Sequence, residues 1–231
     1  MGKLGIITYA HSHLKTEQVL LSLISDEKIK KDITVYALPF KKRNSRDVFF
    51  SHRPNQSNAV SPKTLCDAYD IEYKEVSCDT DIDKSCDDYV ITGAGILSAN
   101  AVKGKKIINC HPGIIPATRG LDAFKWSIYN MRPMGNTLHY IDENVDRGEI
   151  IAVLPTPVFR TDTLETLARR HYENEIKMLS SYQYYLDNPQ NDYADIEMQE
   201  ATKRMPYDVE VKMADMFEEY KIRYAKGRGK I

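Results

Sequence analysis

The run Lys106-Ile107-Ile108-Asn109-Cys110-His111-Pro112-Gly113 is an apolar segment that ends in polar residues and a turn. We predict a strand over Lys106 to Cys110, because short apolar runs bounded by Pro and Gly are typical of buried strands. Alternate residues of a strand point to opposite faces, so we expect Asn109 and His111 on one face and Cys110, as a small buried apolar residue, on the other. The two polar side chains would lie at the carboxyl end of the strand, where open sheets bind ligands.

Further apolar runs precede this segment and alternate with helical patterns. The expected strands are Leu4 to Tyr9, Ile33 to Leu38, Tyr73 to Val76 and Tyr89 to Thr92. Apolar residues recur at helical spacing in Thr16 to Ser25, and Ser61-Pro62 has the serine cap and first-turn proline of a helix that continues through Tyr69. This alternation predicts an α/β fold, a Rossmann-like and mostly parallel sheet with helices on both faces. The polar, basic stretch Lys41 to Asn58 is expected to be a long connection, either a binding loop or a surface insertion.

The pattern changes after Asn130. Two strands, Thr137 to Ile141 and Ile150 to Leu154, are expected to flank a polar stretch. Asp162-Thr163-Leu164-Glu165 predicts a capped helix that runs to about Leu186 and stops at Asn188-Pro189. A last helix is expected over Val209 to Tyr224, and the tail Lys226 to Lys230 is expected to be disordered. We therefore predict one domain over residues 1–188 and a small C-terminal extension over residues 189–231 that ends in a helix.

The composition limits the classes of protein to consider. The 231 residues include 32 basic and 33 acidic side chains, so no broad cationic field favours nucleic acid. No apolar run is long enough for a membrane span, and the start lacks the pattern of a secretory signal. The four cysteines form no C-x-x-C pair, which argues against a disulfide framework or a zinc site and favours the cytoplasm. We expect no bound metal, no nucleic-acid partner and no membrane partner.

Several motifs become informative when they are taken together. Alone, His111 is most simply a satisfied polar residue, Asn109 a turn former, and Asp146 in Val145-Asp146-Arg147-Gly148 a loop residue. In order, however, the chain carries Asn109 to Pro116, Arg119-Gly120, Trp126-Ser127-Ile128, Gly135 to His139 and Asp142 to Ile151. This series resembles the formyltransferases that use 10-formyltetrahydrofolate, and the match covers roughly Tyr89 to Leu154.

The resemblance implies a catalytic group. Asn109, His111 and Asp146 match the family's catalytic Asn, His and Asp. Their chemistry suits attack of an amine on a formyl carbon, because an amide and an imidazole N–H can stabilise the oxyanion that forms. Asp146 would orient and charge the imidazole and could accept the proton that the amine loses. Direct transfer of this kind needs neither a metal nor a covalent enzyme intermediate.

The resemblance also implies a site for the co-substrate 10-formyltetrahydrofolate. The loop Ile91 to Ser98 follows an expected strand and resembles the family's pterin-reading loop, and without the neighbouring motifs it could equally be a plain strand-to-helix turn. Gly93 and Gly95 allow the close backbone approach that a flat heterocycle requires. Ala94, Gly95, Leu97 and Asp142 are carried over as folate-binding residues.

The acceptor amine is indicated less directly. Thr8 to Lys15 has no glycine, which counts against a glycinamide ribonucleotide phosphate at that loop. Only about 40 residues follow Asn188, which counts against the tRNA branch of the family. Phe49 to Gln56 and Lys203 to Pro206 resemble nucleotide-sugar N-formyltransferases. The candidate substrate-binding residues Arg119 and Trp126 resemble the tRNA and amino-sugar branches rather than the purine branch.

We therefore expect a nucleotide-linked amino-dideoxysugar as the acceptor. Arg53 and Lys15 would hold its diphosphate, unless they are solvated surface charges. The alternatives are a phosphoribosylglycinamide-type or other small-amine transformylase, and a folate- or nucleotide-binding module whose catalysis has lapsed. A homodimer is expected, since aminosugar members of the family commonly pair.

Overall fold

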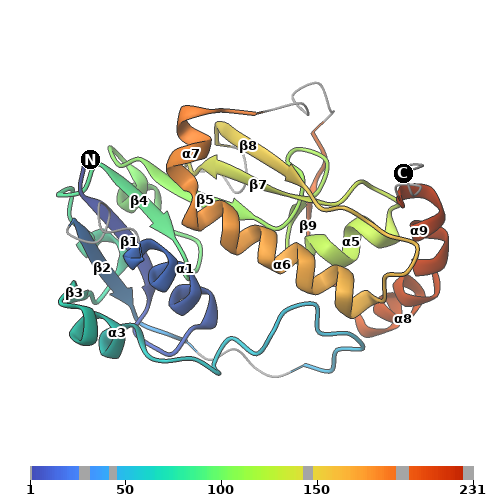
Figure 1. Cartoon of the computed structure of the whole chain (residues 1–231), viewed down its shortest axis with the longest axis horizontal. Helices are drawn as coiled ribbons and strands as arrows, with labels where there is room; N and C mark the ends of the chain where they lie inside the picture. The colour runs from blue at the N-terminus through green and yellow to red at the C-terminus, as the bar shows by residue number, and fades with distance from the viewer. Residues whose placement is uncertain (1, 26–31, 42–45, 143–147, 191–197, 226–231) are drawn as a thin grey trace.

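The computed structural model describes residues 2–25, 32–41, 46–142, 148–190 and 198–225. A seven-stranded sheet in the order β3-β2-β1-β4-β5-β7-β8 runs through the molecule (Figure 1). Its strands are β1 (Leu4–Tyr9), β2 (Ile33–Leu38), β3 (Glu72–Glu75), β4 (Asp88–Ile91), β5 (Ile107–His111), β7 (Gly135–Tyr140) and β8 (Ile150–Pro155). The first five strands pair in parallel, while β7 and β8 are antiparallel. The predicted α/β fold with a mostly parallel sheet is confirmed.

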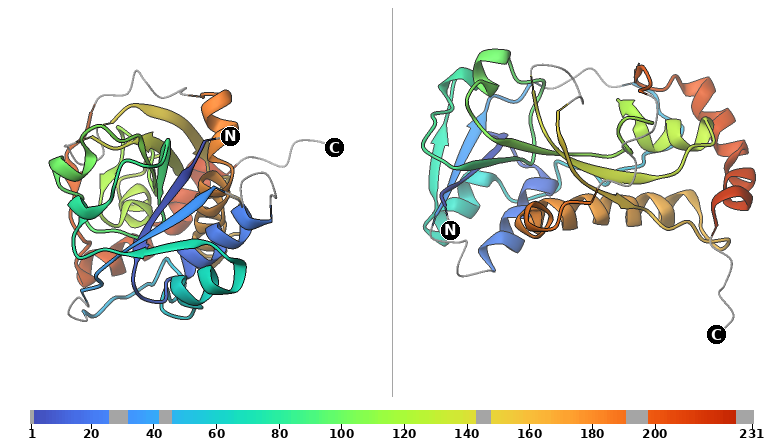
Figure 2. Two further views of the ribbon diagram at one scale, coloured as in Figure 1. Left: turned by 90° about the vertical axis from the view of Figure 1, so that its left-hand side faces the viewer. Right: turned by 90° about the horizontal axis from the view of Figure 1, so that it is seen from above.

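Helices and turns cover both faces of the sheet. One face packs against α1 (Leu14–Ile24), α3 (Pro62–Tyr69), α6 (Leu164–Ser180) and α7 (Tyr182–Asp187). The other face packs against the 3₁₀ turn η1 (Asp79–Asp81) and the short α4 (Ala99–Val102). The right-hand view of Figure 2 shows α1 and α6 on one side of the sheet and α4 on the other. Burial of apolar side chains on both faces stabilises the parallel strands, which cannot leave a face in water.

A third apolar cluster joins the C-terminal helices to the rest of the chain. It contains Phe124 of α5 (Ala123–Tyr129) and Leu167 of α6, together with Met213 of α8 (Tyr207–Asp215) and Tyr220 of α9 (Phe217–Tyr224). A two-stranded pair, β6 (Arg119–Gly120) with β9 (Ala201–Thr202), links the same regions. The described part of the C-terminal extension therefore packs directly on the region that follows β5.

Two helices that the sequence predicts as continuous are each divided in the structure. The helix expected to reach Leu186 breaks at Ser181 into α6 and α7, and the last helix breaks at Met216 into α8 and α9. The predicted cap is also displaced. Thr163 and Thr166 exchange side-chain bonds with each other's backbone N–H, while Asp162 instead pairs with Arg170 at 2.7 Å. The ion pair with Arg170 therefore outweighs the capping preference of the buried Asp162.

Candidate active site

Four polar side chains share one face of the β5–β7 pair. In the antiparallel register Asn109 lies opposite His139, and His111 lies opposite Thr137. Cys110 lies between them on the other face, where its buried thiol is 3.9 Å from the Met178 sulfur. The expected shared face of Asn109 and His111, and the apolar surroundings of Cys110, are both confirmed.

The partners of His139 fix the direction of the Asn109 amide. Nδ1 of His139 lies 3.0 Å from the Tyr140 carbonyl oxygen, which can only accept, so Nδ1 carries the proton. In the neutral ring Nε2 then accepts, and it lies 3.3 Å from Asn109 Nδ2. One N–H of Asn109 is used in this bond. Because the amide is planar, the direction of its second N–H is set as well.

Side-chain hydrogen bonds hold the turn that follows β5. Nε2 of His111 donates to the Thr118 carbonyl at 3.0 Å. The Thr137 hydroxyl donates to the Gly113 carbonyl at 2.7 Å and accepts from the backbone N–H of Ile115 at 3.0 Å. A Cβ on Gly113 would lie 2.5 Å from the Thr118 carbonyl oxygen and 2.8 Å from His111 Nε2. Only glycine therefore allows the turn to close over the imidazole.

His171 of α6 supports the same turn from the opposite side. Its Nε2 donates to the Pro112 carbonyl at 3.2 Å, so Nδ1 accepts from the Thr156 hydroxyl at 2.9 Å. Asn174 Nδ2 lies 3.3 Å from the same hydroxyl. Burial lowers the pKa of His171 to about 4. The ring is therefore neutral near pH 7, as this donor and acceptor arrangement requires.

A buried carboxylate joins the two cations expected to bind phosphate. Glu175 of α6 lies 3.0 Å from Lys15 Nζ and 2.6 Å from a terminal nitrogen of Arg53. Burial alone would raise the pKa of Glu175, but Arg53 and Lys15 outweigh it and bring the pKa to about 2. The structure thus brings Lys15 and Arg53 together, neither as an isolated surface charge. Two positive charges and one negative charge leave one net positive charge in this triad.

The long connection expected from the sequence is anchored at both ends. We call residues 46–58 the strap; it forms no helix or strand and runs along the lower edge of Figure 1. At one end the backbone N–H groups of Phe49 and Phe50 donate to buried Glu210 at 2.7 and 3.2 Å. At the other end the Gln56 carbonyl accepts from Leu14 N–H at 2.7 Å. The strap is therefore held in position, and it carries Arg53 to Glu175.

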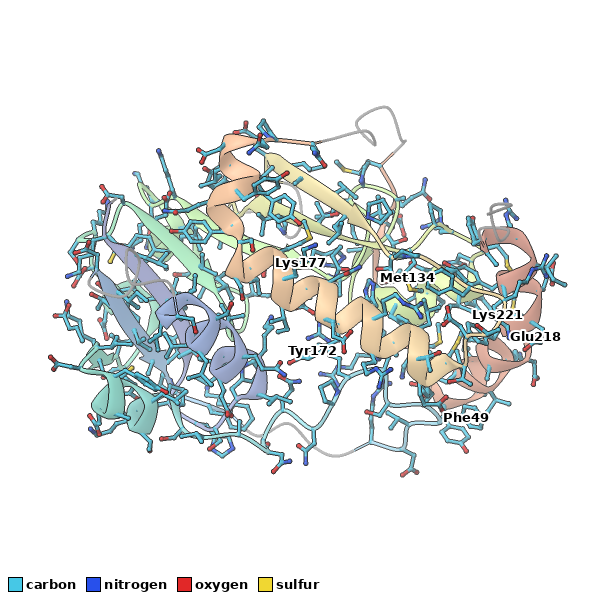
Figure 3. The ribbon with its side chains drawn as sticks, viewed as in Figure 1. Phe49, Met134, Tyr172, Lys177, Glu218 and Lys221 are labelled. Atoms are coloured by element: carbon cyan, nitrogen blue, oxygen red, sulfur yellow. The ribbon has the colours of Figure 1, made fainter. Side chains whose placement is uncertain are left out.

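Tyr172 lies beside the strap's second anchor. Figure 3 shows it projecting from α6 toward the strap. Its hydroxyl donates to Gln18 Oε1 at 2.8 Å, and Gln56 Nε2 lies 3.5 Å from the Tyr172 hydroxyl oxygen. The Arg53 guanidinium lies 5.9 Å from the centre of its ring. Arg53 therefore contacts α6 through both an ion pair and an aromatic face.

The residues expected to bind folate lie after β4 and β7. Ala94 and Leu97 are half-buried against the cluster that contains Tyr36 and Val102, while Gly95 and Asp142 are exposed. The intervening Ile96 is 86% exposed. Because Ala94 and Leu97 pack against this cluster, the exposed segment between them can present its main-chain groups to a flat ligand.

Two further expected substrate residues contact the C-terminal extension. Buried Arg119 donates to the Gln199 carbonyl at 3.1 Å. The indole N–H of Trp126 donates to the Lys203 carbonyl at 2.7 Å, and its ring meets Tyr129 edge-on. Both therefore hold residues 199–203 against the region after β5. Asp146 and the tail Lys226 to Lys230 lie outside the described residues.

The structure adds His139, Thr137, His171 and Glu175 to the candidate site. His139 and Thr137 stand in the motif Gly135 to His139, but their roles depend on pairing with β5. His171 and Glu175 are four residues apart on the apolar stripe of α6, and both are at least 97% buried. A histidine and a glutamate on a buried helical stripe are a signal that the sequence did offer, because such groups stay inside a protein only when they are paired.

No group of three or more histidine, cysteine or acidic side chains suited to a metal ion occurs among the described residues. Within the same residues, no helix has both the length and the apolar character needed to cross a membrane.

The part of the chain that forms this site is similar in sequence to known proteins. Residues 73–182, which include the β5 motif and α6, match the family model described as Formyl transferase. The phosphoribosylglycinamide formyltransferase of Bacillus subtilis is 40% identical over 79 residues, which are 34% of this chain and 40% of that protein. The chain thus matches less than half the length of this curated relative.

Solved structures extend the likeness over most of the chain. A sugar N-formyltransferase from a Shewanella species superposes with a TM-score of 0.59 at 17% identity, over 92% of this chain and 87% of that one. An N-formyltransferase of Helicobacter canadensis, solved with folinic acid and dTDP-3-aminofucose, gives 0.57 at 18% identity, over 95% and 82%. At these identities the likeness is one of fold. Through residues 73–182, the chain is similar to the formyl transferase family.

Proposed function

We propose that the protein is an N-formyltransferase that moves the formyl group of 10-formyltetrahydrofolate to the amine of a nucleotide-linked amino-dideoxysugar. The observation that carries formyl transfer is the Asn109 amide, oriented by His139 beside His111 on the strand that the family motif marks. The acceptor is inferred from the cationic triad and from the strap.

The proposed reaction is a direct transfer. The acceptor nitrogen attacks the formyl carbon and gives a tetrahedral intermediate whose oxygen is negative. The second N–H of Asn109 is directed by its bond to His139 and is proposed to donate to that oxygen. Collapse of the intermediate breaks the bond between the formyl carbon and N10 of the folate. The proton lost by the amine ends on N10, so the products are a formamide and tetrahydrofolate.

We propose for His111 and Asp146 the catalytic roles that the family resemblance implies. Nε2 of His111 is bonded to the Thr118 carbonyl, so the ring is held rigidly at the end of β5. Asp146 is proposed to charge this imidazole and to receive the amine proton. Ala94, Gly95, Leu97 and Asp142 are proposed to contact the pterin. A preorganised oxyanion donor contributes roughly 10²–10³ in rate.

The charge of the triad supports a diphosphate. Glu175 balances only one of the two cations, and a guanidinium can contact phosphate oxygens with the nitrogens that Glu175 does not use. The Helicobacter neighbour is described in complex with folinic acid and dTDP-3-aminofucose, which favours the same pair of substrates. Arg119 and Trp126 are proposed to serve the acceptor site indirectly, through the segment that they hold.

A purine-type acceptor is the second candidate. The curated relatives include phosphoribosylglycinamide formyltransferases, with 40% identity to the Bacillus protein and 32% to that of Haemophilus influenzae. Those two matches cover 34% and 32% of this chain, so they bear on only part of it. A glycinamide acceptor would use the same catalytic group with a different amine.

One assay separates the candidates. The purified full chain is incubated with 10-formyltetrahydrofolate and, separately, with dTDP-, UDP- and GDP-linked aminosugars and glycinamide ribonucleotide, and the formylated product is detected by mass. We expect a product with an aminosugar nucleotide and a loss of roughly 10²–10³ in kcat for Asn109→Ala. Product with glycinamide ribonucleotide alone would support the second candidate, and folate binding without any product would indicate lapsed catalysis. The mass in light scattering tests the predicted homodimer.

A further inference from the structure

Three aromatic rings gather at the carboxyl ends of β1 and β2. We call Tyr9, His11 and Phe40 the edge platform. The His11 and Phe40 rings stack with centres 4.9 Å apart at 19°, and Tyr9 meets Phe40 edge-on at 5.2 Å. His11 is exposed, and Phe40 is 46% exposed although it follows a completely buried strand. An aromatic surface therefore remains open to solvent at the edge where α/β sheets bind ligands.

The edge platform is fixed to the same sheet edge as the catalytic strand. Tyr9 also meets His13 edge-on at 5.7 Å. A Cβ on Gly93, just beyond β4, would lie 3.0 Å from atoms of both His13 and Tyr9. The parallel strands β2, β1, β4 and β5 are successive neighbours, so the rings and His111 lie along one line of strand ends. Three strand spacings of about 4.8 Å separate the end of β2 from that of β5, or about 14 Å.

The charged triad lies between the rings and the catalytic strand. Lys15 lies in the first turn of α1, two residues after His13, whose ring meets Tyr9 edge-on. Glu175 lies about one turn of α6 before Met178, whose sulfur is 3.9 Å from the Cys110 thiol on β5. The triad is therefore close to His13 on one side and to Cys110 on the other. Across the strands the order is therefore aromatic rings, net positive charge and β5, which carries Asn109 on the face opposite to Cys110.

We propose that the edge platform binds the nucleobase of a nucleoside diphosphate whose phosphates lie at Lys15 and Arg53 and whose sugar amine reaches Asn109. The inference rests on the proposed nucleotide-sugar acceptor and adds the place of its base. A nucleotide sugar has the same order of parts, a flat ring, an anionic diphosphate and a hexose. Its hexose and diphosphate together have a reach comparable with three strand spacings.

Stacking explains why rings replace a glycine-rich loop here. A glycine-rich loop binds phosphate through its exposed backbone N–H groups. The segment Thr8 to Lys15 contains no glycine. Aromatic faces bind bases without requiring a particular hydrogen-bond pattern, and loss of one such ring costs about 1–3 kcal/mol per base, or roughly 5- to 150-fold in affinity. Glu175 would hold the two cations in place before the diphosphate arrives.

The test measures binding by calorimetry with the full chain. The probes are dTDP, UDP, GDP and inorganic pyrophosphate, and the variants are Phe40→Ala, His11→Ala and Phe40→Tyr. Tyr184→Ala is the matched control, because Tyr184 is an exposed ring (59%) in an edge contact on α7. We expect Phe40→Ala to weaken the best nucleoside diphosphate by roughly 5- to 150-fold and His11→Ala to weaken it in the same direction. Phe40→Tyr and Tyr184→Ala should bind as the unmodified protein does.

Pyrophosphate separates the base from the phosphates. Its affinity should be unchanged in Phe40→Ala, because that variant keeps Lys15 and Arg53. Equal nucleotide affinity in Phe40→Ala and the unmodified protein overturns the inference, and so does a loss of folate affinity in place of nucleotide affinity. Failure of the unmodified protein to bind any of the three nucleotides also overturns it. The proposed function is judged separately, by formylation of aminosugar nucleotides by the unmodified protein.

Discussion

The hydroxyl of Thr137 shows how much one side chain determines at this site. It donates to the Gly113 carbonyl and accepts from the Ile115 N–H, so it bonds to both neighbours of Ile114. The turn carries Pro112 directly after His111, so its position decides where the imidazole lies. The hydroxyl is itself buried, and water cannot replace it without rearrangement.

Thr137→Val tests this role. Valine has nearly the same shape but leaves a carbonyl and an N–H of the turn without a side-chain partner, at a cost of about 1–3 kcal/mol for each group left unsatisfied. We expect a lower free energy of unfolding in urea and reduced formyl transfer. Thr137→Ser keeps the hydroxyl and should recover most of both. Equal stability of the valine variant and the unmodified protein would show that the hydroxyl does not hold the turn.

Glu175→Gln tests the triad. Removing one partner of a buried ion pair leaves uncompensated charge, so we expect a loss of about 3–5 kcal/mol in the free energy of unfolding. Glu173→Gln is the matched control on the same helix, because Glu173 is exposed and lies 3.8 Å from exposed Arg169. Its loss should be about 0–1 kcal/mol. Similar losses in the two variants would argue against a stabilising triad.

Sequence reasoning found the part of the site that lies within one stretch of chain. Asn109 and His111 follow from a strand pattern and a motif, and their common face needs only the alternation of a strand. Glu175 could not be assigned to Arg53 in the same way, because the two are 122 residues apart and meet only when α6 crosses the sheet. The same holds for His171 and Pro112. Long-range packing decides these pairs, and no local pattern specifies it.

At the scale of elements, one buried carboxylate anchors the strap beside the Arg46–Asp122 ion pair at 2.9 Å. Glu210 of α8 is completely buried and accepts from Phe49 N–H, Phe50 N–H and Lys125 Nζ, the last at 2.7 Å. Figure 3 shows Phe49 at the end of the strap beside the C-terminal helices. A single residue thus joins the strap, α5 and α8. The strap in turn carries Arg53.

Glu210→Gln should release the strap before it unfolds the protein. We expect faster amide hydrogen exchange at Phe49 and Phe50 and a smaller effect in β1 and β2. The reason is that Glu210 accepts hydrogen bonds from the strap and from α5 and, among the described residues, from neither of these strands. Glu218→Gln on α9 is the control, since the Glu218 side chain is 80% exposed. Exchange at Phe49 and Phe50 that matches the control would mean that other contacts hold the strap.

Element boundaries also show where sequence patterns lose information. β1 and β2 are observed over the predicted residues, since short apolar runs have clear ends. No proline or glycine marks the helix breaks at Ser181 and Met216, and the apolar pattern of the sequence continues across both positions. β6 and β9 have two residues each and exist only because they pair with each other. Such elements follow from the tertiary structure.

For the whole molecule, buried neutral histidines predict sensitivity to acid. Burial lowers the pKa of His13 and His171 to about 4 and that of His52 to about 3, from the ordinary histidine value of 6.5. The unfolded chain therefore binds more protons than the folded one between about pH 6.5 and pH 4, so stability falls as the pH falls through this range. For His171 alone the difference is of the order of 3 kcal/mol.

Urea unfolding at pH 7 and pH 5 checks this prediction. We expect the free energy of unfolding to be lower at pH 5, and His171→Gln to reduce the difference between the two values even if the variant is less stable at both. Tyr184→Ala provides the control, because it removes an exposed ring (59%) and no histidine, and it should leave the difference unchanged. A pH dependence that is identical in His171→Gln and the unmodified protein would falsify the assignment of His171 as a buried neutral group.

The pairing of β6 with β9 has a consequence for the order in which the protein matures. Strand β5 and its turn are synthesised by residue 120, but β9, the Arg119 and Trp126 acceptors at 199–203, and Glu210 emerge from the ribosome about 80 to 90 residues later. A nascent chain that has reached only α7 has its catalytic strand without the segment that secures the neighbouring region. Residues 199–210 must therefore be synthesised before the region after β5 gains these contacts.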